Sequence, residues 1–180
     1  MFGINGLIYL PEFVSMPEQE TLLKTIDGCP WDTSLRRRVQ HYGYRYDYKA
    51  RRVTPEMYLG VLPDWLGRIA QRLRDEGLIA QTPDQVIVNE YAPGQGIAAH
   101  VDCEPCFGHR IFSLSLGSAA MMQFTNRERG RIELMLEPRS LLMMHGEARY
   151  DWKHGIPARK SDNGVHRTRR VSLTFRRVTL

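Results

Sequence analysis

Six short apolar segments follow one another from residue 85 to the end of the chain, and they constrain the fold more than any other feature. Each is rich in Val, Ile, Leu, Met or Phe, and Gly, Pro and charged residues separate them. They read QVIVNEYA, IFSLSLG, AMMQFT, IELMLEP, SLLMMHGE and RVSLTFRRV. This texture predicts a run of β-strands rather than alternating βαβ units.

Two amphipathic helices are predicted before the strands. Ser15 and Glu18 have capping-box spacing, and apolar residues then recur on one face, so we expect a helix over residues 16–28 that ends at Gly28. A second apolar stripe predicts a helix from Pro63 to Asp75. Helices first and strands afterwards indicate a helical layer packed on a β-sandwich or jelly roll, which is a mainly β fold with flanking helices (α+β).

Length and composition are typical of one globular domain over residues 1–180, because 42% of the residues are hydrophobic. The N-terminal segment lacks the basic region of a signal peptide, and no apolar run approaches membrane-spanning length. We therefore expect a soluble, cytoplasmic and monomeric protein that has no membrane partner. Lys and Arg number 25 against 20 Asp and Glu, a net charge of +5 that favours an anionic partner, although solvated surface arginines would give the same total.

Residues 36–53 interleave arginines with His41 and four tyrosines. Aromatic rings stack on bases and arginines reach phosphates, so the segment has the composition of a nucleotide-recognition lid. An edge strand with alternating tyrosines is the alternative reading.

Two histidines and one aspartate are candidate metal ligands. His100 and Asp102 are two residues apart at the end of a strand-like run, so both can approach one metal ion. His154 is our choice for the third ligand because Gly155 lets the backbone come close, and His145 is held in reserve. Two imidazoles and one carboxylate on one face of Fe(II) leave positions open for an organic acid and dioxygen.

Two arginines on the last strand are candidate anchors for that acid. Arg170 and Arg176 are separated by an even number of residues and so face the same side, opposite Val171 and the other apolar residues. Their guanidinium groups match carboxylates, which predicts 2-oxoglutarate as the cosubstrate.

The chain has three cysteines, an odd number that does not indicate a disulfide framework and that suits a reducing compartment. Cys103 and Cys106 near His100 suggest zinc, but a second pair of ligands at the usual spacing is missing, so we expect ordinary thiols.

Three motifs, NEYAPGQGIAAHVD, GEARYDWKHGI and RVSLTFR, resemble the AlkB family of Fe(II)/2-oxoglutarate-dependent dioxygenases and occur in the family's order. The resemblance covers most of the chain from about residue 85 to residue 177, and HYGYRYDY loosely resembles the family's lid. It implies a double-stranded β-helix (jelly-roll) core and three iron ligands, His100, Asp102 and His154.

The same resemblance implies roles for residues around the iron. Arg170, with Tyr91, would hold the C5 carboxylate of 2-oxoglutarate, and Arg176 with Asn89 would serve the C1 end. Ser172 stands where the founding enzyme of the family has an asparagine. Residues expected to contact the flipped base are Arg38, Tyr42, Tyr44, Tyr46 and Glu104.

The activity that the resemblance implies is oxidative dealkylation of damaged bases in DNA or RNA, with release of succinate, carbon dioxide and an aldehyde. SLSLGSAAMMQF and GEARYDWKHGI are also similar to the family member that hydroxylates a modified wobble uridine in tRNA, which is the alternative. Two readings from other classes stay open: a jelly-roll binding module without chemistry, and a nucleic-acid-binding protein stabilised by zinc.

Overall fold

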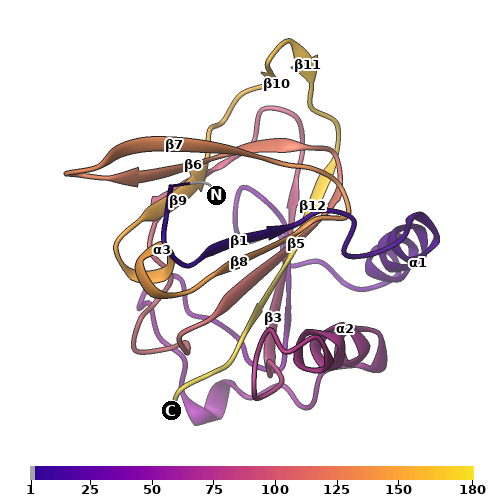
Figure 1. Cartoon of the computed structure of the whole chain (residues 1–180). Helices are drawn as coiled ribbons and strands as arrows, with labels where there is room; N and C mark the ends of the chain where they lie inside the picture. The colour runs from indigo at the N-terminus through magenta and orange to yellow at the C-terminus, as the bar shows by residue number, and fades with distance from the viewer. Residues whose placement is uncertain (1–2) are drawn as a thin grey trace.

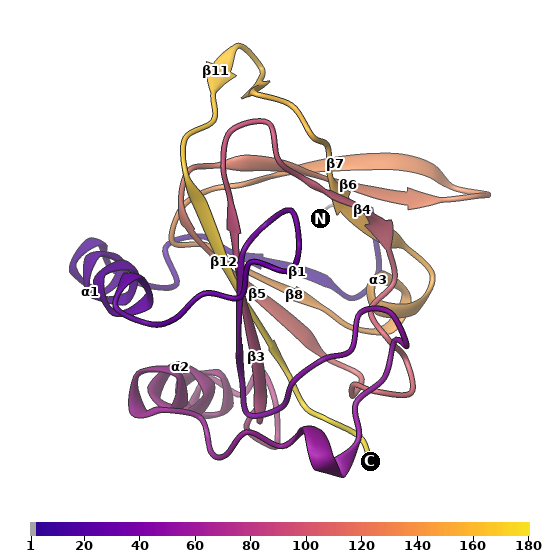
Figure 2. The same ribbon diagram turned by 180° about the vertical axis from the view of Figure 1, so that it is seen from behind.

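Two antiparallel β-sheets face each other in the computed structural model, which describes residues 3–180 (Figure 1). The larger sheet has the strand order β1-β8-β5-β12-β3-β2, and the smaller one has the order β4-β9-β6-β7. This arrangement is a double-stranded β-helix, or jelly roll, as expected. A two-stranded hairpin, β10–β11, projects from one end in both views (Figures 1 and 2). The elements are β1 (Leu7–Leu10), α1 (Met16–Asp27), β2 (Val39–Tyr42), a 3₁₀ turn (Pro55–Met57), α2 (Asp64–Asp75), β3 (Gln85–Tyr91), β4 (Ile97–His100), β5 (Ile111–Gly117), β6 (Ala120–Asn126), β7 (Gly130–Leu136), β8 (Leu141–Met144), α3 (Gly146–Tyr150), β9 (Lys153–Ile156), β10 (Ser161–Asp162), β11 (Val165–His166) and β12 (Arg170–Arg176).

The two predicted helices form where the capping and apolar patterns place them. The Ser15 side chain accepts a hydrogen bond from the Glu18 N–H, and the Glu18 carboxylate accepts one from the Ser15 N–H, so the capping box is complete. Gly28 caps the C-terminus of α1, and Pro63 precedes α2. Both helices pack on the outer face of the larger sheet.

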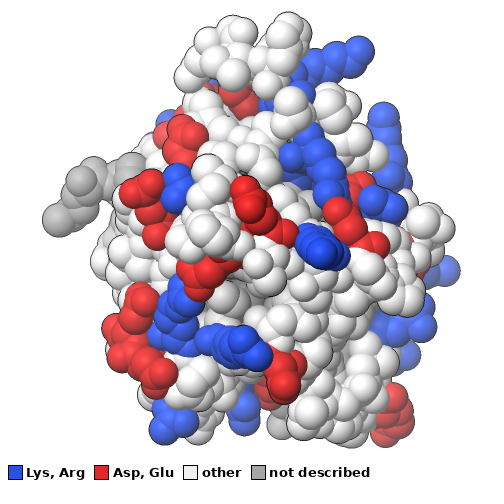
Figure 3. Space-filling view, turned by 90° about the vertical axis from the view of Figure 1, so that its right-hand side faces the viewer, with Lys and Arg blue, Asp and Glu red and all other residues white. Residues whose placement is uncertain are grey.

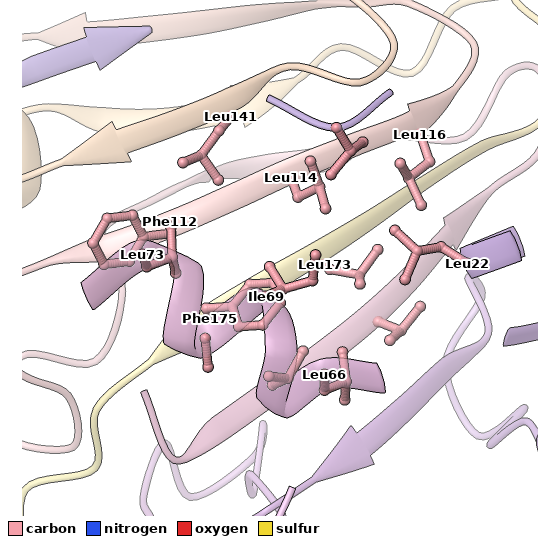
Figure 4. Close-up of a cluster of buried hydrophobic side chains, with 14 of the residues drawn as sticks. Leu22, Leu66, Ile69, Leu73, Phe112, Leu114, Leu116, Leu141, Leu173 and Phe175 are labelled. Atoms are coloured by element: carbon pink, nitrogen blue, oxygen red, sulfur yellow. The ribbon is translucent and has the colours of Figure 1, made fainter. Parts of the chain in front are cut away.

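The larger sheet has an apolar face and a polar face, and β12 shows the division. Val171, Leu173 and Phe175 pack under α1 and α2 in one buried cluster with residues of β3 and β5 (Figure 4). Arg170 and Arg176 point to the opposite side, toward the smaller sheet. The alternation read from the sequence is confirmed, and it places polar side chains inside the jelly roll.

A second apolar cluster lies between the two sheets and leaves room for a cavity at one end. It includes Phe124, Leu142 and Trp152, each at most 1% exposed. Among the described residues, no helix is long and apolar enough to cross a membrane.

One expected strand is shorter than its sequence suggests. The segment SLLMMHGE forms β8 only as far as Met144, and a short helix, α3, begins at Gly146. Gly146 has a φ of +51°, a conformation that favours glycine and ends the extended backbone.

The positive net charge does not form a uniform basic surface over the helices. Figure 3 shows this side of the molecule, with Lys and Arg beside Asp and Glu. Arg72 of α2 pairs with Glu18 of α1, and Arg169 pairs with Asp27 and Glu90. Several arginines counted toward an anionic partner therefore have internal partners.

Candidate metal centre and its cavity

A cavity of about 390 Å³ opens between the two sheets. Its wall is formed by the polar face of β3, β5 and β12, by the ends of β4 and β9, and by part of the segment 36–53. The polar and charged side chains that line it are Arg37, Tyr46, Tyr48, Arg51, Asn89, Tyr91, His100, Asp102, Ser113, His154, Arg170, Ser172, Thr174 and Arg176.

His100, Asp102 and His154 converge in this cavity. One ligand atom from each lies within 4.8 Å of the others, and this is the group of metal-capable side chains found among residues 3–180. The His100 Nε2 atom is 3.4 Å from Asp102 Oδ1, and His154 Nε2 is 4.0 Å from the same oxygen. Three ligand atoms at these separations surround a point where one ion fits. His145, the reserve choice, precedes α3 and lies outside the group.

Strand pairing brings the two imidazoles together. His100 ends β4 and is directly opposite His154 on the neighbouring strand β9, with ring centroids 4.5 Å apart. A Cβ atom at Gly155 would lie 2.8 Å from the Ala99 nitrogen, so only glycine lets β9 approach β4 this closely. The expected reason for a glycine after His154 is therefore confirmed.

The charge states of His154 and Asp102 and the orientation of His100 suit a cation. Burial lowers the pKa of His154 to about 4, so its imidazole is neutral at pH 7. His100 Nδ1 lies 2.8 Å from the Ala98 carbonyl, which orients Nε2 toward the cavity. Burial would raise the pKa of Asp102, but the Arg176 guanidinium and the two histidines hold it well below its usual range, so it is an anion.

Arg170 lies deep in the cavity. It is 3% exposed, and its Nη2 donates to the Ser115 hydroxyl. Among residues 3–180 it has no carboxylate partner, and its Nε and Nη1 have no hydrogen-bond partner. Its guanidinium carbon is 5.4 Å from the centre of the Tyr91 ring. Burying a cation with two unpaired donors costs free energy unless an anion binds to it, so this position fits one carboxylate of a dicarboxylate.

Arg176 and Asn89 line the cavity, but each already has a protein partner. Arg176 Nε donates to Asp102 Oδ2 at 3.0 Å, so this arginine holds the candidate metal ligand. The Asn89 side-chain oxygen accepts from Arg37 Nε at 3.0 Å. Their expected contact with the C1 end of 2-oxoglutarate stays a prediction. The structure shows a further role for Arg176, which orients the Asp102 carboxylate.

The segment 36–53 contributes to the cavity with residues that differ in part from those expected. Tyr46 lines it, and so do Arg37, Tyr48 and Arg51, which sequence reasoning missed. The Tyr46 and Tyr48 rings meet edge to face, with centroids 5.0 Å apart. The arginine–tyrosine composition pointed to this segment, but only coordinates show which side chains face inward.

Four residues expected at the substrate lie outside the cavity lining. Arg38 makes a bidentate ion pair with Glu90, and the Tyr42 ring packs against Trp65 of α2. Tyr44 packs against Tyr58 at 5.0 Å. Glu104 is exposed on a turn that follows Asp102. Arg38, Tyr42 and Tyr44 therefore have structural partners away from the metal ligands.

Cys103 and Cys106 form a disulfide, which corrects the expectation of free thiols. The turn after Asp102 brings the two sulfur atoms together, and both residues are buried. Their spacing is compatible with thiols, a disulfide or zinc, so the sequence alone did not decide between them. Because the sulfurs are bonded to each other, the zinc-binding alternative loses its thiolate ligands. Cys29 is the free cysteine.

The residues present fit Fe(II) and 2-oxoglutarate. Two imidazoles and one carboxylate are the donor set of non-haem iron oxygenases, a set that would leave coordination positions free for a cosubstrate and dioxygen. The unpaired donors of Arg170 lie in the same cavity and would take the distal carboxylate of the cosubstrate.

Comparisons with known proteins point to the same chemistry. Residues 6–176 match the 2OG-Fe(II) oxygenase superfamily. The chain is 38% identical to an alkylated DNA repair protein ALKBH8 homolog of Arabidopsis thaliana, over 98% of this chain and 59% of that protein. It is 41% identical to the mouse tRNA (carboxymethyluridine(34)-5-O)-methyltransferase ALKBH8, over 87% of this chain and 25% of that protein. The solved structure of OsALKBH1 superposes with a TM-score of 0.73 at 20% identity, covering 96% of both chains.

Proposed function

The chain belongs to the 2OG-Fe(II) oxygenase superfamily, in its AlkB branch, and from this premise we propose that it oxidises an alkyl group on a base of DNA or RNA. It is a dioxygenase that uses Fe(II), 2-oxoglutarate and dioxygen. This membership argues against a jelly-roll binding module without chemistry. The chain spans 59% of the Arabidopsis relative and 25% of the mouse one, so their substrates are carried over only as proposals.

The positive charge of the cavity is the main observation in favour of a nucleic-acid substrate. Four arginines and one carboxylate line it, so they leave an excess of three positive charges. A ferrous ion and a dianionic cosubstrate cancel each other and do not reduce this excess. Arg37 and Arg51 account for two of the positive charges, and among residues 3–180 neither has an acidic partner. Phosphates of a nucleic acid would supply the missing negative charge.

The aromatic wall beside these arginines suits a base. Tyr46 packs against Phe107 and meets Tyr48 edge to face, and the Arg37 guanidinium lies 5.9 Å from the Tyr48 ring centre. A flipped base stacks on such rings, and the arginines reach its flanking phosphates. We therefore retain residues 36–53 as the lid, with Arg37, Tyr48 and Arg51 added to Tyr46.

The protein's part in the reaction is positioning. His100, Asp102 and His154 would hold the iron, and Arg170 with Tyr91 would hold the distal carboxylate of the cosubstrate. Ser172 and Thr174 line the same cavity on β12. When bound, the iron with its cosubstrate and dioxygen supplies the oxidant for a C–H bond. Hydroxylation of an N-methyl carbon gives a hemiaminal that releases formaldehyde and the restored base, while 2-oxoglutarate becomes succinate and carbon dioxide.

A second candidate is hydroxylation of a modified wobble uridine in tRNA. The mouse relative, 41% identical over 87% of this chain, is named for tRNA carboxymethyluridine, and the Arabidopsis relative is named as a homolog of the same protein, ALKBH8. In this reaction the hydroxyl group stays on a carbon side chain of the base, so no aldehyde is released.

One panel of assays distinguishes base dealkylation from hydroxylation of the wobble uridine. Methylated DNA, methylated RNA and modified tRNA are incubated with the enzyme, Fe(II) and 2-oxoglutarate, and succinate, formaldehyde and nucleoside masses are measured. Dealkylation predicts formaldehyde equal to succinate, whereas hydroxylation predicts an added oxygen and no formaldehyde. Asp102→Ala should abolish both. Succinate formation that no nucleic acid stimulates would contradict the proposed substrate class.

A further inference from the structure

Arg149 is one of the most deeply buried charged residues in the chain, and the chemistry described above does not use it. It lies on α3, is 2% exposed and has no carboxylate partner among the described residues. Burying a cation without an anion is costly, and an apolar residue of similar volume would be cheaper. Its contacts therefore call for an explanation.

The Arg149 guanidinium binds the turn that carries Asp102. Nη1 donates to the carbonyl of Asp102 at 2.9 Å, and Nη2 lies 3.2 Å from the carbonyl of Cys103 and 3.4 Å from that of Phe107. The ring of Tyr150 lies 4.9 Å from the guanidinium carbon. Three backbone carbonyls of one turn thus accept from one side chain, and the Cys103 carbonyl also accepts from the Phe107 N–H.

This contact joins the two segments that carry the candidate metal ligands. Asp102 follows β4, and α3 comes immediately before β9 with His154 (Figure 2). Asp102 is held at both ends, because Arg176 bonds its carboxylate and Arg149 bonds its carbonyl. Movement of the turn relative to α3 would carry the Asp102 oxygen away from His154.

We propose that Arg149 is a positioning residue for the metal centre, which fixes the Asp102 turn against α3 and so holds the three ligand atoms at one point. The proposal rests on the metal site described under the proposed function. Residues that orient metal ligands typically change metal affinity by 10- to 100-fold when they are replaced. The expected effect is therefore on metal binding before any turnover.

The test compares Arg149→Met and Arg149→Lys with the wild-type protein and with Arg129→Met. Arg129 is exposed and pairs with Glu147 on the same helix, so it controls for the loss of an arginine contact to α3. Circular dichroism establishes folding, and titration with Co(II) gives a dissociation constant and a visible spectrum. Lysine keeps the charge but has a single nitrogen for three carbonyls.

The expected result is a 10- to 100-fold weaker Co(II) affinity and an altered Co(II) spectrum in folded Arg149→Met, a smaller loss in Arg149→Lys and no change in Arg129→Met. Wild-type affinity and spectrum in either folded Arg149 variant would overturn the proposal. If neither variant folds, Arg149 serves folding and the proposal is wrong. If the wild-type protein itself does not bind Co(II), the metal site and the proposed function fail with it.

Discussion

Replacing Arg170 by methionine should stabilise the metal-free protein and weaken 2-oxoglutarate binding at the same time. In the absence of ligand, Nε and Nη1 of this buried guanidinium have no partner. Each unsatisfied buried donor costs about 1–3 kcal/mol, whereas the lost bond to Ser115 stabilises by about 1 kcal/mol. Methionine has a similar length and no polar hydrogens, so a net gain of about 1 kcal/mol or more, or a rise in Tm of about 2–4 °C, is expected.

Cosubstrate binding should change in the opposite direction. Two charge-assisted hydrogen bonds to a carboxylate contribute about 1.5–3 kcal/mol each, so their loss weakens 2-oxoglutarate by about 100-fold or more. Thermal unfolding with Mn(II) in place of Fe(II) measures both effects without turnover, because a ligand raises Tm by mass action. Arg127→Met, on an exposed turn, is the control. A lower Tm of the metal-free variant together with an unchanged response to 2-oxoglutarate would refute the role of Arg170.

Three further predictions concern the hairpin, the disulfide and the lid. Asp162 is 4% exposed, and although burial raises its pKa, hydrogen bonds from Arg167 and the Met121 N–H bring it to about 2. Its stabilisation is present above the unfolded-state pKa near 4 and is lost as pH falls toward 2, so Asp162→Asn should lower the free energy of unfolding by about 2 kcal/mol at pH 7 and by about half of that at pH 3 in urea titrations. A difference that does not change with pH would contradict this. Cys106→Ser should cost about 2 kcal/mol because the disulfide closes a short loop in the unfolded chain. Dithiothreitol should lower the wild-type Tm to that of the variant, and a Tm insensitive to reductant would show that the bond does not form. Arg37→Ala should raise the KM for nucleic acid and reduce the slope of log KM against log salt by about one. A KM and a salt slope equal to those of the wild type would remove Arg37 from the substrate site.

The sequence predicted the parts of the fold in which local pattern and burial agree. The alternation along β12 correctly separated Val171 and its apolar neighbours from Arg170 and Arg176. The capping box of α1 was also predicted, because it depends on residues close in sequence. The choice of His154 as the partner of His100 on another strand rested on Gly155 and on the family resemblance.

For residues 36–53, the sequence did not indicate which side chains face the cavity. β2 ends at Tyr42, and Gly43 follows with a φ of +75° and so close to the Asp84 carbonyl that a Cβ atom does not fit. Tyr42, Tyr44, Tyr46 and Tyr48 all occur at every second residue, so their spacing gave no basis for choosing among them. After the turn at Gly43, Tyr46 and Tyr48 line the cavity, whereas Tyr42 and Tyr44 do not. Arg149 gave no signal in sequence, because an arginine in a short helix is ordinarily exposed.

Cytoplasmic location, a monomeric state and a single domain over residues 1–180 stay predictions from length, composition and charge.

The convergence of three side chains on one ferrous ion is tested most directly by a crystal structure of the protein with Mn(II) and 2-oxoglutarate, with anomalous diffraction used to locate the metal. The account predicts one anomalous peak within about 2.0–2.3 Å of His100 Nε2, Asp102 Oδ1 and His154 Nε2, with 2-oxoglutarate reaching Arg170. A metal bound elsewhere, or bound without one of these three side chains, would contradict it.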